Sequence, residues 1–194
     1  AGTHFGFQAP SKRKTIAIKG YHGWVGRALV ALDAVESLQH DLRDYEIVVY
    51  SANRKVVRRV RRLKQKTGLN LVTHKKGSLS HGQVLEIFRK SRIYVGISLS
   101  DGISTSLLEA MAAGAFPIQT STSCAHEWVV DGQSGVLITT LAREPIASAV
   151  ALALEEDELV DAAHQLNMNK IIENAAPDSL MRQARRFYAL DSRD

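Results

Sequence analysis

The stretch that decides the fold is residues 93–120, IYVGISLSDGISTSLLEAMAAGAFPIQT. Its first seven residues form an apolar run typical of a buried strand, and residues 115–120 form another. Between them, the hydroxyl residues Ser104 to Ser106 favour the start of a helix, and Gly114 suits the left-handed turn that ends many helices. The stretch therefore predicts a strand, a helix and a second strand of an open α/β sheet, in which ligands bind at the carboxyl ends of the strands.

Two carboxylates lie in this strand–helix segment. Asp101 follows the strand, and Glu109 lies eight positions later, inside the helix. Carboxylates accept hydrogen bonds from hydroxyl groups, and the free N–H groups of a helix start suit a phosphate, so the segment suits a sugar nucleotide. The alternatives are structural, because Asp101-Gly102 is also a common turn pair and Ser106-x-x-Glu109 also fits a capping box. The flanking strands favour the ligand interpretation.

The same alternation of apolar strands and amphipathic helices runs through most of the chain. It predicts further strands and helices at the following positions: strands 15–20, 46–51, 69–74 and 135–138, and helices 27–38, 54–66, 83–90, 145–154, 156–173 and 178–190. We therefore predict an α/β fold with a single Rossmann-like, doubly wound parallel sheet of about six strands and extra carboxyl-terminal helices. Residues 1–14 are expected to be an irregular lead-in, and residues 15–194 one domain.

The composition is that of an ordinary globular domain, with 194 residues of which 45% are hydrophobic and 23% charged. Cys124 is the only cysteine, which excludes a disulfide within the chain and a zinc site built from cysteines. The seven histidines fall in no spacing typical of metal ligands, so we expect no bound metal. No apolar run approaches the roughly 20 residues that span a bilayer.

The net charge of +5 comes from one segment, 54–66, RKVVRRVRRLKQK, which holds eight basic residues and no acid. Its valines and its leucine recur at helical spacing, which predicts an amphipathic helix. The simplest interpretation is a solvated face on a helix that packs through its apolar stripe. The alternatives are binding to anionic lipid and, ranked last because no aromatic residue lies among the arginines, binding to nucleic acid.

A glycine-rich turn at 20–28, GYHGWVGRA, follows the first strand and leads into a helix. Such a turn lets the backbone approach a ligand, and the helix start favours a phosphate. The spacing of its glycines differs from G-x-G-x-x-G, and the second strand ends without an acid, which argues against NAD. The chain contains no G-x-x-x-x-G-K-[ST], which excludes a P-loop.

Residues 94–138 resemble the donor-binding signature of retaining glycosyltransferases of family 4 type, which have the GT-B fold. The resemblance rests on an acid and a glutamate separated by seven residues, on EAMA followed by glycine and proline, and on an E-x-x-x-D-G-x-x-G tail at 127–135. Here the acid is Asp101, where the family usually has glutamate, and the glutamate is Glu109. In the position of the family's G-F-G stand Gly102, Ile103 and Ser104.

The resemblance implies that the chain is the carboxyl-terminal, donor-binding half of a GT-B enzyme. Together with an amino-terminal acceptor domain, it would bind a nucleoside-diphosphate sugar and transfer the glycosyl group with retention, without a metal. Asp101 would bind hydroxyls of the sugar, Glu109 the ribose hydroxyls, and the cations Lys19 and Arg27 the diphosphate. Further donor contacts are expected from Gly20, Gly102, Ile103, Ser104, Thr105, Ser106 and Lys75.

The alternative function is a non-catalytic Rossmann-like module that uses residues 54–66 to bind anionic lipid or nucleic acid. The intact pair of Asp101 and Glu109 favours the enzyme. We expect a cytoplasmic location, with the basic segment as a peripheral contact to the anionic inner face of the membrane.

Overall fold

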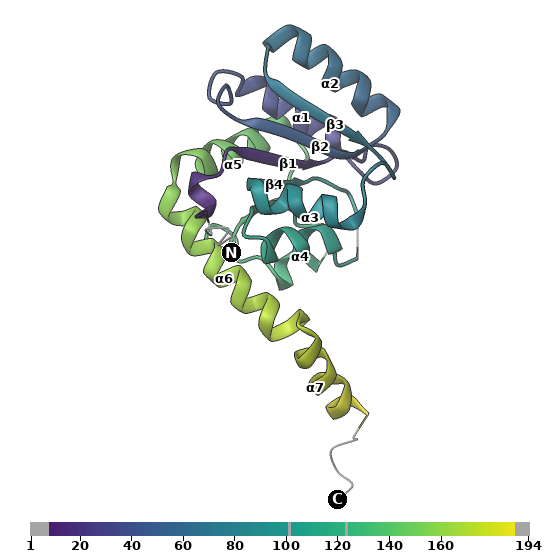
Figure 1. Ribbon diagram of the computed structural model, residues 1–194, viewed down its shortest axis with the longest axis vertical. Coiled ribbons are helices and arrows are strands. Elements are labelled where there is room, and N and C mark those ends of the chain that lie inside the picture. Colours follow the sequence, from purple (N-terminus) through teal and green to yellow (C-terminus); the bar gives the residue numbers. More distant parts are fainter. Residues whose placement is uncertain (1–7, 101, 123, 189–194) are drawn as a thin grey trace, which may run out of the picture.

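The computed structural model describes residues 8–100, 102–122 and 124–188, so Asp101 lies outside the described residues. Its centre is a six-stranded sheet in the order β3-β2-β1-β4-β5-β6, and every neighbouring pair is parallel (Figure 1). The strands are β1 Thr15–Lys19, β2 Glu46–Ala52, β3 Asn70–Lys75, β4 Ser91–Gly96, β5 Phe116–Thr120 and β6 Val136–Ile138. The predicted Rossmann-like parallel sheet is confirmed.

Helices cover both faces of this sheet. They are α1 Ala28–Ser37, α2 Arg54–Thr67, α3 His81–Lys90, α4 Thr105–Ala112, α5 Arg143–Glu155, α6 Asp157–Ala175 and α7 Pro177–Phe187, with short 3-10 helices at Pro10–Lys12 and Cys124–Glu127. Helices α1, α2 and α5 share one hydrophobic core with the sheet, and α3 and α4 share the other (Figure 1). The expected helix at 178–190 is seen as α7, although its last residues lie outside the described part of the chain.

The strands β1, β2, β4 and β5 are largely buried on both faces because their side chains alternate between the two cores. In β1, Ile16 and Ile18 point into the core of α1, α2 and α5, whereas Ala17 points into the core of α3 and α4. In β2, Val49 and Tyr50 divide between the two cores in the same way. This arrangement explains why the strands are continuous apolar runs rather than alternating patterns.

The start of α3 lies two residues before the expected position, at His81. The reason is a capping box: the Ser80 hydroxyl accepts from the backbone N–H of Gln83 at 3.3 Å, and the Gln83 amide oxygen accepts from the backbone N–H of Ser80 at 2.8 Å. These two bonds satisfy N–H groups that a helix start otherwise leaves unpaired.

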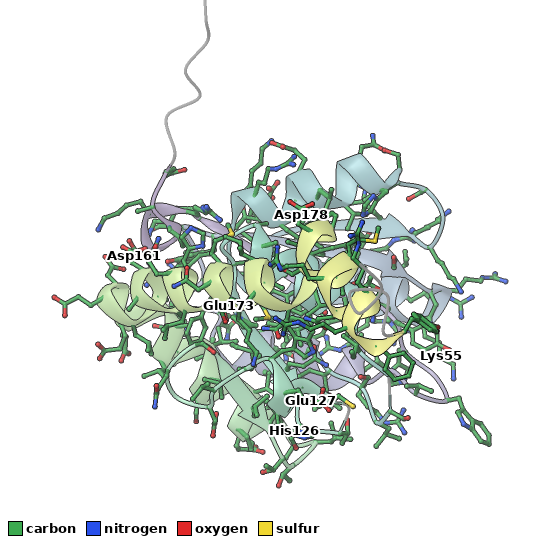
Figure 2. All side chains as sticks on the ribbon, turned by 90° about the horizontal axis from the view of Figure 1, so that it is seen from below. Lys55, His126, Glu127, Asp161, Glu173 and Asp178 are labelled. Carbon is green, nitrogen blue, oxygen red and sulfur yellow. The ribbon has the colours of Figure 1, made fainter. Side chains whose placement is uncertain are left out.

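The segment before β1 also differs from the expected irregular lead-in. Pro10–Lys12 forms a turn of 3-10 helix, and Ser11 binds the carboxylate of Asp161 on α6 through its backbone N–H at 3.0 Å and its hydroxyl at 2.7 Å. Figure 2 shows Asp161 and Glu173 along α6, and Asp178 on α7, which projects from the body of the domain in Figure 1. Hydrogen bonds to a distant helix thus order a segment that has no apolar periodicity of its own.

A buried arginine joins the sheet to the corner between α5 and α6. The side chain of Arg92 is only 2% exposed, and it donates to the backbone oxygens of Ala153 at 2.6 Å and Leu154 at 3.1 Å. It also binds the backbone oxygen of Ser11 and forms an ion pair with Asp157 at 2.7 Å. A charge is tolerated at this depth because its donors are paired. Across the described residues, no helix is both long and apolar enough to cross a membrane.

Candidate functional site

A cleft of about 410 Å³ opens at the carboxyl ends of β1 and β4. The chain leaves β1 toward one side of the sheet and returns to β4 on the other, so this is the point where the strand order reverses. Open α/β sheets bind ligands at such points, and the volume lies in the usual range for small molecules, about 300–1,000 Å³. The cleft is lined by Lys19, Tyr21, Val25, Gly26, Ser51, Lys76, Ile97, Ser98 and Ser100.

The glycine-rich loop after β1 forms one wall of the cleft and is tied to the segment after β4. The backbone N–H of Arg27 donates to the oxygen of Ile97 at 3.0 Å, and that of Leu99 donates to the oxygen of Val25 at 2.8 Å. A side chain at Gly26 would collide with the carbonyl of Tyr21. The loop is therefore held in one shape before any ligand binds.

Gly20, a predicted donor contact, is buried at the base of this loop. Its backbone N–H donates to the carbonyl oxygen of Tyr50 at 2.7 Å, and an added Cβ would lie 2.7 Å from that same oxygen. Contacts between the ends of β1 and β2 therefore require a glycine here, whether or not a ligand binds.

Of the two predicted diphosphate-binding cations, Lys19 is placed in the cleft. Its Nζ lies 3.4 Å from the hydroxyl oxygen of Ser104, which is the N-cap residue of α4. A cation and the positive end of a helix thus lie side by side, and both attract an anion.

Arg27, in contrast, is the N-cap residue of α1 and binds its own loop. Its Nη1 donates to the backbone oxygens of Gly23 at 2.6 Å and Gly26 at 3.0 Å. Arg27 does not line the cleft, so its expected contact with a diphosphate stays a prediction.

The residues around the start of α4 combine exposed and buried positions. Gly102, Ile103 and Thr105 are exposed, with Ile103 at 50%, whereas the N-cap residue Ser104 is buried. The hydroxyl of Ser104 does not cap the helix, and the N–H of Leu107 donates instead to the backbone oxygen of Ser104 at 2.9 Å. Ser106 is half-buried above the fully buried Tyr50. Burial raises the pKa of the Tyr50 hydroxyl above its usual value, so this group is neutral at ordinary pH.

Glu109 lies in the second turn of α4 and does not cap the helix. The helix begins at Thr105, so Ser106 lies inside it and the alternative of a Ser106–Glu109 capping box is wrong. Oε1 of Glu109 instead lies 2.7 Å from Nε2 of His81, the first residue of α3. Glu109 thus faces α3 and is not part of the cleft wall.

The loop after β3 contributes Lys76, and not Lys75, to the cleft. Lys75 is exposed at the end of β3, whereas Lys76 lines the cleft with its Nζ 6.0 Å from the ring centre of Tyr21. Consecutive side chains at a strand end point to opposite sides, so only one of two neighbouring lysines can face the ligand. The contact expected from Lys75 stays a prediction.

Several residues of the site carry no motif that sequence reasoning detected. Ser51, at the end of β2, lines the cleft with a φ of 52°, a left-handed conformation that is uncommon outside glycine. The position of His81 could have been predicted, because Ser80-x-x-Gln83 is a capping-box pattern that makes His81 the first residue of a helix. Within the described residues, no group of three or more His, Cys, Asp or Glu side chains could hold a metal ion.

The basic helix α2 packs as its apolar stripe predicted, with Val56, Val60 and Leu63 buried. Three of its eight basic residues bind groups of the same chain. Arg59 forms ion pairs with Asp33 at 2.8 Å and with Glu36, Lys66 pairs with Glu36 at 2.7 Å, and Lys64 donates to the backbone oxygen of Leu71 at 3.1 Å. The other five are exposed and form what we call the basic face: Arg54, Lys55, Arg58, Arg61 and Arg62. Lys55 is labelled in Figure 2.

Comparison with protein families matches residues 3–175 to the family described as "Glycosyl transferases group 1". Comparison with curated proteins gives no match. Among solved structures, the carboxyl-terminal domain of a group 1 glycosyl transferase (LpcC) from Francisella tularensis is similar with a TM-score of 0.71 and 20% identity, over 84% of this chain and 86% of that one.

Two larger proteins are similar over only part of their length. S. aureus TarM, in a complex that includes UDP, has a TM-score of 0.75 at 14% identity, over 96% of this chain and 37% of its own. Anabaena HepE, in complex with UDP and glucose, has a TM-score of 0.74 at 10% identity, over 93% of this chain and 49% of its own. The chain thus spans less than half of either protein, and these likenesses establish the shared fold.

Proposed function

The chain belongs to the group 1 glycosyl transferases, and we propose that it binds a nucleoside-diphosphate sugar in the cleft at β1 and β4. The observation that carries this proposal is the meeting of Lys19 with the start of α4, where Nζ lies 3.4 Å from the Ser104 hydroxyl. A diphosphate placed there would face a cation and the amino-terminal N–H groups of α4 together. The complexes of TarM and HepE contain UDP, which supports a nucleotide as the ligand of this fold.

In the proposed complex, the residues around α4 divide the donor between them. Glu109 accepts hydrogen bonds from the ribose, and Asp101 accepts them from the transferred sugar. Backbone and hydroxyl groups of 102–106 face the distal phosphate. When the bond to the sugar breaks, negative charge develops on the leaving diphosphate, and Lys19 with the helix start would offset it. Arg27 and Lys75 are proposed as secondary contacts to the phosphates, and no metal is required.

We propose further that transfer proceeds with retention and needs an amino-terminal domain that binds the acceptor. The two larger relatives support the need for a second domain, because the chain corresponds to less than half of each. Transfer depends on holding both reactants in one geometry. The 194-residue chain alone should therefore bind the donor but transfer sugar very slowly, as measured with a radiolabelled donor. Rapid transfer by this chain alone would contradict the division into two domains.

A thermal-melting screen tests the binding proposal directly. The chain is heated with UDP, GDP, dTDP and ADP sugars, and with inorganic pyrophosphate as a control for simple anion binding. A ligand at 100 times its Kd stabilises by about 2.7 kcal/mol, which corresponds to roughly 5–11 °C in a protein of this size. A shift with one nucleotide class and not with pyrophosphate is expected. Absence of a shift with all four sugar nucleotides would refute the proposal.

Two lysine variants test whether the rise in Tm comes from a nucleotide bound in the cleft. Lys19→Met should reduce it, because Lys19 lines the cleft. Lys90→Met is the matched control, since Lys90 lies with Thr15 and Glu46 at the opposite ends of the strands and pairs with Glu86 at 3.5 Å. Equal shifts in both variants would place the nucleotide elsewhere on the protein.

The basic face of α2 supports a second, separate proposal, a peripheral contact with anionic membrane. Five exposed cations on one helix, without an acid in that helix, would contribute about 1 kcal/mol each near such a surface. This contact would keep the enzyme at the cytoplasmic side of a membrane. Nucleic acid is the weaker alternative, because no aromatic side chain lies among these residues.

A further inference from the structure

A histidine and the proposed ribose-binding carboxylate meet across two helices of the second core. His81 is the first residue of α3, and Glu109 lies in the second turn of α4. Nε2 of His81 is 2.7 Å from Oε1 of Glu109, a short hydrogen bond between segments that are 28 residues apart in the sequence.

The backbone that carries His81 is held firmly. The reciprocal bonds between Ser80 and Gln83 cap the first turn of α3, at 3.3 and 2.8 Å. Farther along the same helix, Phe88 is fully buried and packs edge-to-face against Tyr50 and Tyr94, with ring centres 5.4 and 5.6 Å apart. The imidazole therefore approaches Glu109 from a fixed support.

Glu109 itself sits between burial and exposure, with 24% of its side chain accessible. A glutamate has three rotatable side-chain bonds, and a ribose diol requires its carboxylate in one place. The bond to His81 occupies Oε1, while no partner for Oε2 is found in the part of the chain that the structure describes. One oxygen is thus anchored and the other is left for a ligand.

From this geometry we propose that His81 is a positioning residue that holds the Glu109 carboxylate ready for the ribose of the donor. The proposal rests on the function proposed above for the cleft. A ring N–H of the imidazole can donate to Oε1 of Glu109, and this bond restricts the rotation of the carboxylate before the donor binds.

The other titratable groups around this pair come from three directions. Tyr50 lies beneath α4 and is neutral because burial raises the pKa of its hydroxyl. Lys19 reaches the start of α4 from β1, and Lys75 and Lys76 lie in the loop before α3. The remaining charges of α3 pair among themselves, as Glu86 does with Arg89 and Lys90 at 3.5 Å.

Calorimetric titration with UDP, GDP, dTDP and ADP tests the proposal. His81→Ala should weaken binding of the preferred nucleotide by about three- to fivefold, the range expected for a partly exposed pair of polar side chains. His81→Gln, which can still donate to Glu109, should restore most of the affinity. This rescue is the readout that a merely structural role of His81 would not give.

His40→Ala is the matched control, since His40 is exposed in the turn after α1, before the start of β2. Wild-type affinity in His81→Ala would overturn the positioning role, and so would tighter binding, which would mean that His81 competes with the ribose. A wild-type chain that binds none of the four nucleotides would instead refute the proposed function of the cleft.

Discussion

Replacing Glu109 with alanine should separate binding from folding more cleanly than any other change at this site. Glu109 is 24% exposed, and its hydrogen-bond partner His81 is 70% exposed. Loss of such a pair costs at most about 1 kcal/mol, so Tm should fall by no more than about 2–4 °C. A charge-assisted hydrogen bond to ribose, in contrast, contributes roughly 1.5–3 kcal/mol. The Kd for the preferred nucleoside diphosphate should therefore rise by about 13- to 160-fold.

The assay is isothermal titration of wild type, Glu109→Ala and Glu109→Gln with the same nucleoside diphosphate. Glu109→Gln keeps one acceptor oxygen and should fall between the other two. Glu86→Ala is the matched control, because Glu86 is also a glutamate, is 52% exposed and pairs with Arg89 and Lys90 of its own helix. If Glu109→Ala and Glu86→Ala bind with the same Kd as wild type, Glu109 does not hold the ribose and the proposed position of the donor is wrong.

Three further predictions concern stability and surface binding. Phe88→Ala should lower the unfolding free energy by about 3–5 kcal/mol, because Phe88 is fully buried between two aromatic rings. In a thermal melt, Tm should fall by roughly 6–20 °C, and a Tm within about 2 °C of wild type would contradict this packing. Hydrogen bonding to Lys12 and then to Arg92 lowers the pKa of Asp157 from 3.8 to about 2, so its contribution to stability is present above about pH 4 and is lost as the pH falls toward 2. Asp157→Asn should therefore melt below wild type at pH 7, and the gap should shrink between pH 4 and 2; a gap that does not depend on pH would exclude this linkage. The basic face of α2 should cause co-sedimentation with anionic vesicles that weakens at high salt, as the Debye length shortens. If replacing the basic face by glutamine leaves co-sedimentation at low salt unchanged, the face is only solvated.

Much of the fold follows from local pattern. The apolar runs and helical stripes predicted six strands and the helices between them, and the structure shows that sheet with every pair parallel. Gly114 was expected at the end of α4, and its φ of 87° is the left-handed conformation that favours glycine. These features depend on residues close together in the chain, whose preferences and periodicity a reader of the sequence can see.

The position of the cleft in the fold also follows from the sequence, although the identity of the residues that line it does not. The resemblance to the donor-binding signature predicts that Lys19 and Ser104 both lie near the donor, and the carboxyl ends of parallel strands meet at one edge of the sheet. The structure brings them to 3.4 Å, yet it turns Arg27 onto its own loop and places Lys76, rather than Lys75, in the cleft. Which of several nearby cations faces the cleft depends on backbone turns that no motif specifies.

What only the tertiary structure decided are the contacts between distant segments. His81 meets Glu109, and Arg92 on β4 meets Asp157 at the start of α6, 65 residues later. Arg59, which the sequence presents as one more solvated charge of α2, is bound to two acids of α1. By itself, the sequence determined the elements, their parallel arrangement and the edge of the sheet where a ligand is expected, because these depend on local preference and burial. The partner of each side chain depends on how whole helices and strands pack, to within an ångström or so, and local pattern does not contain that information.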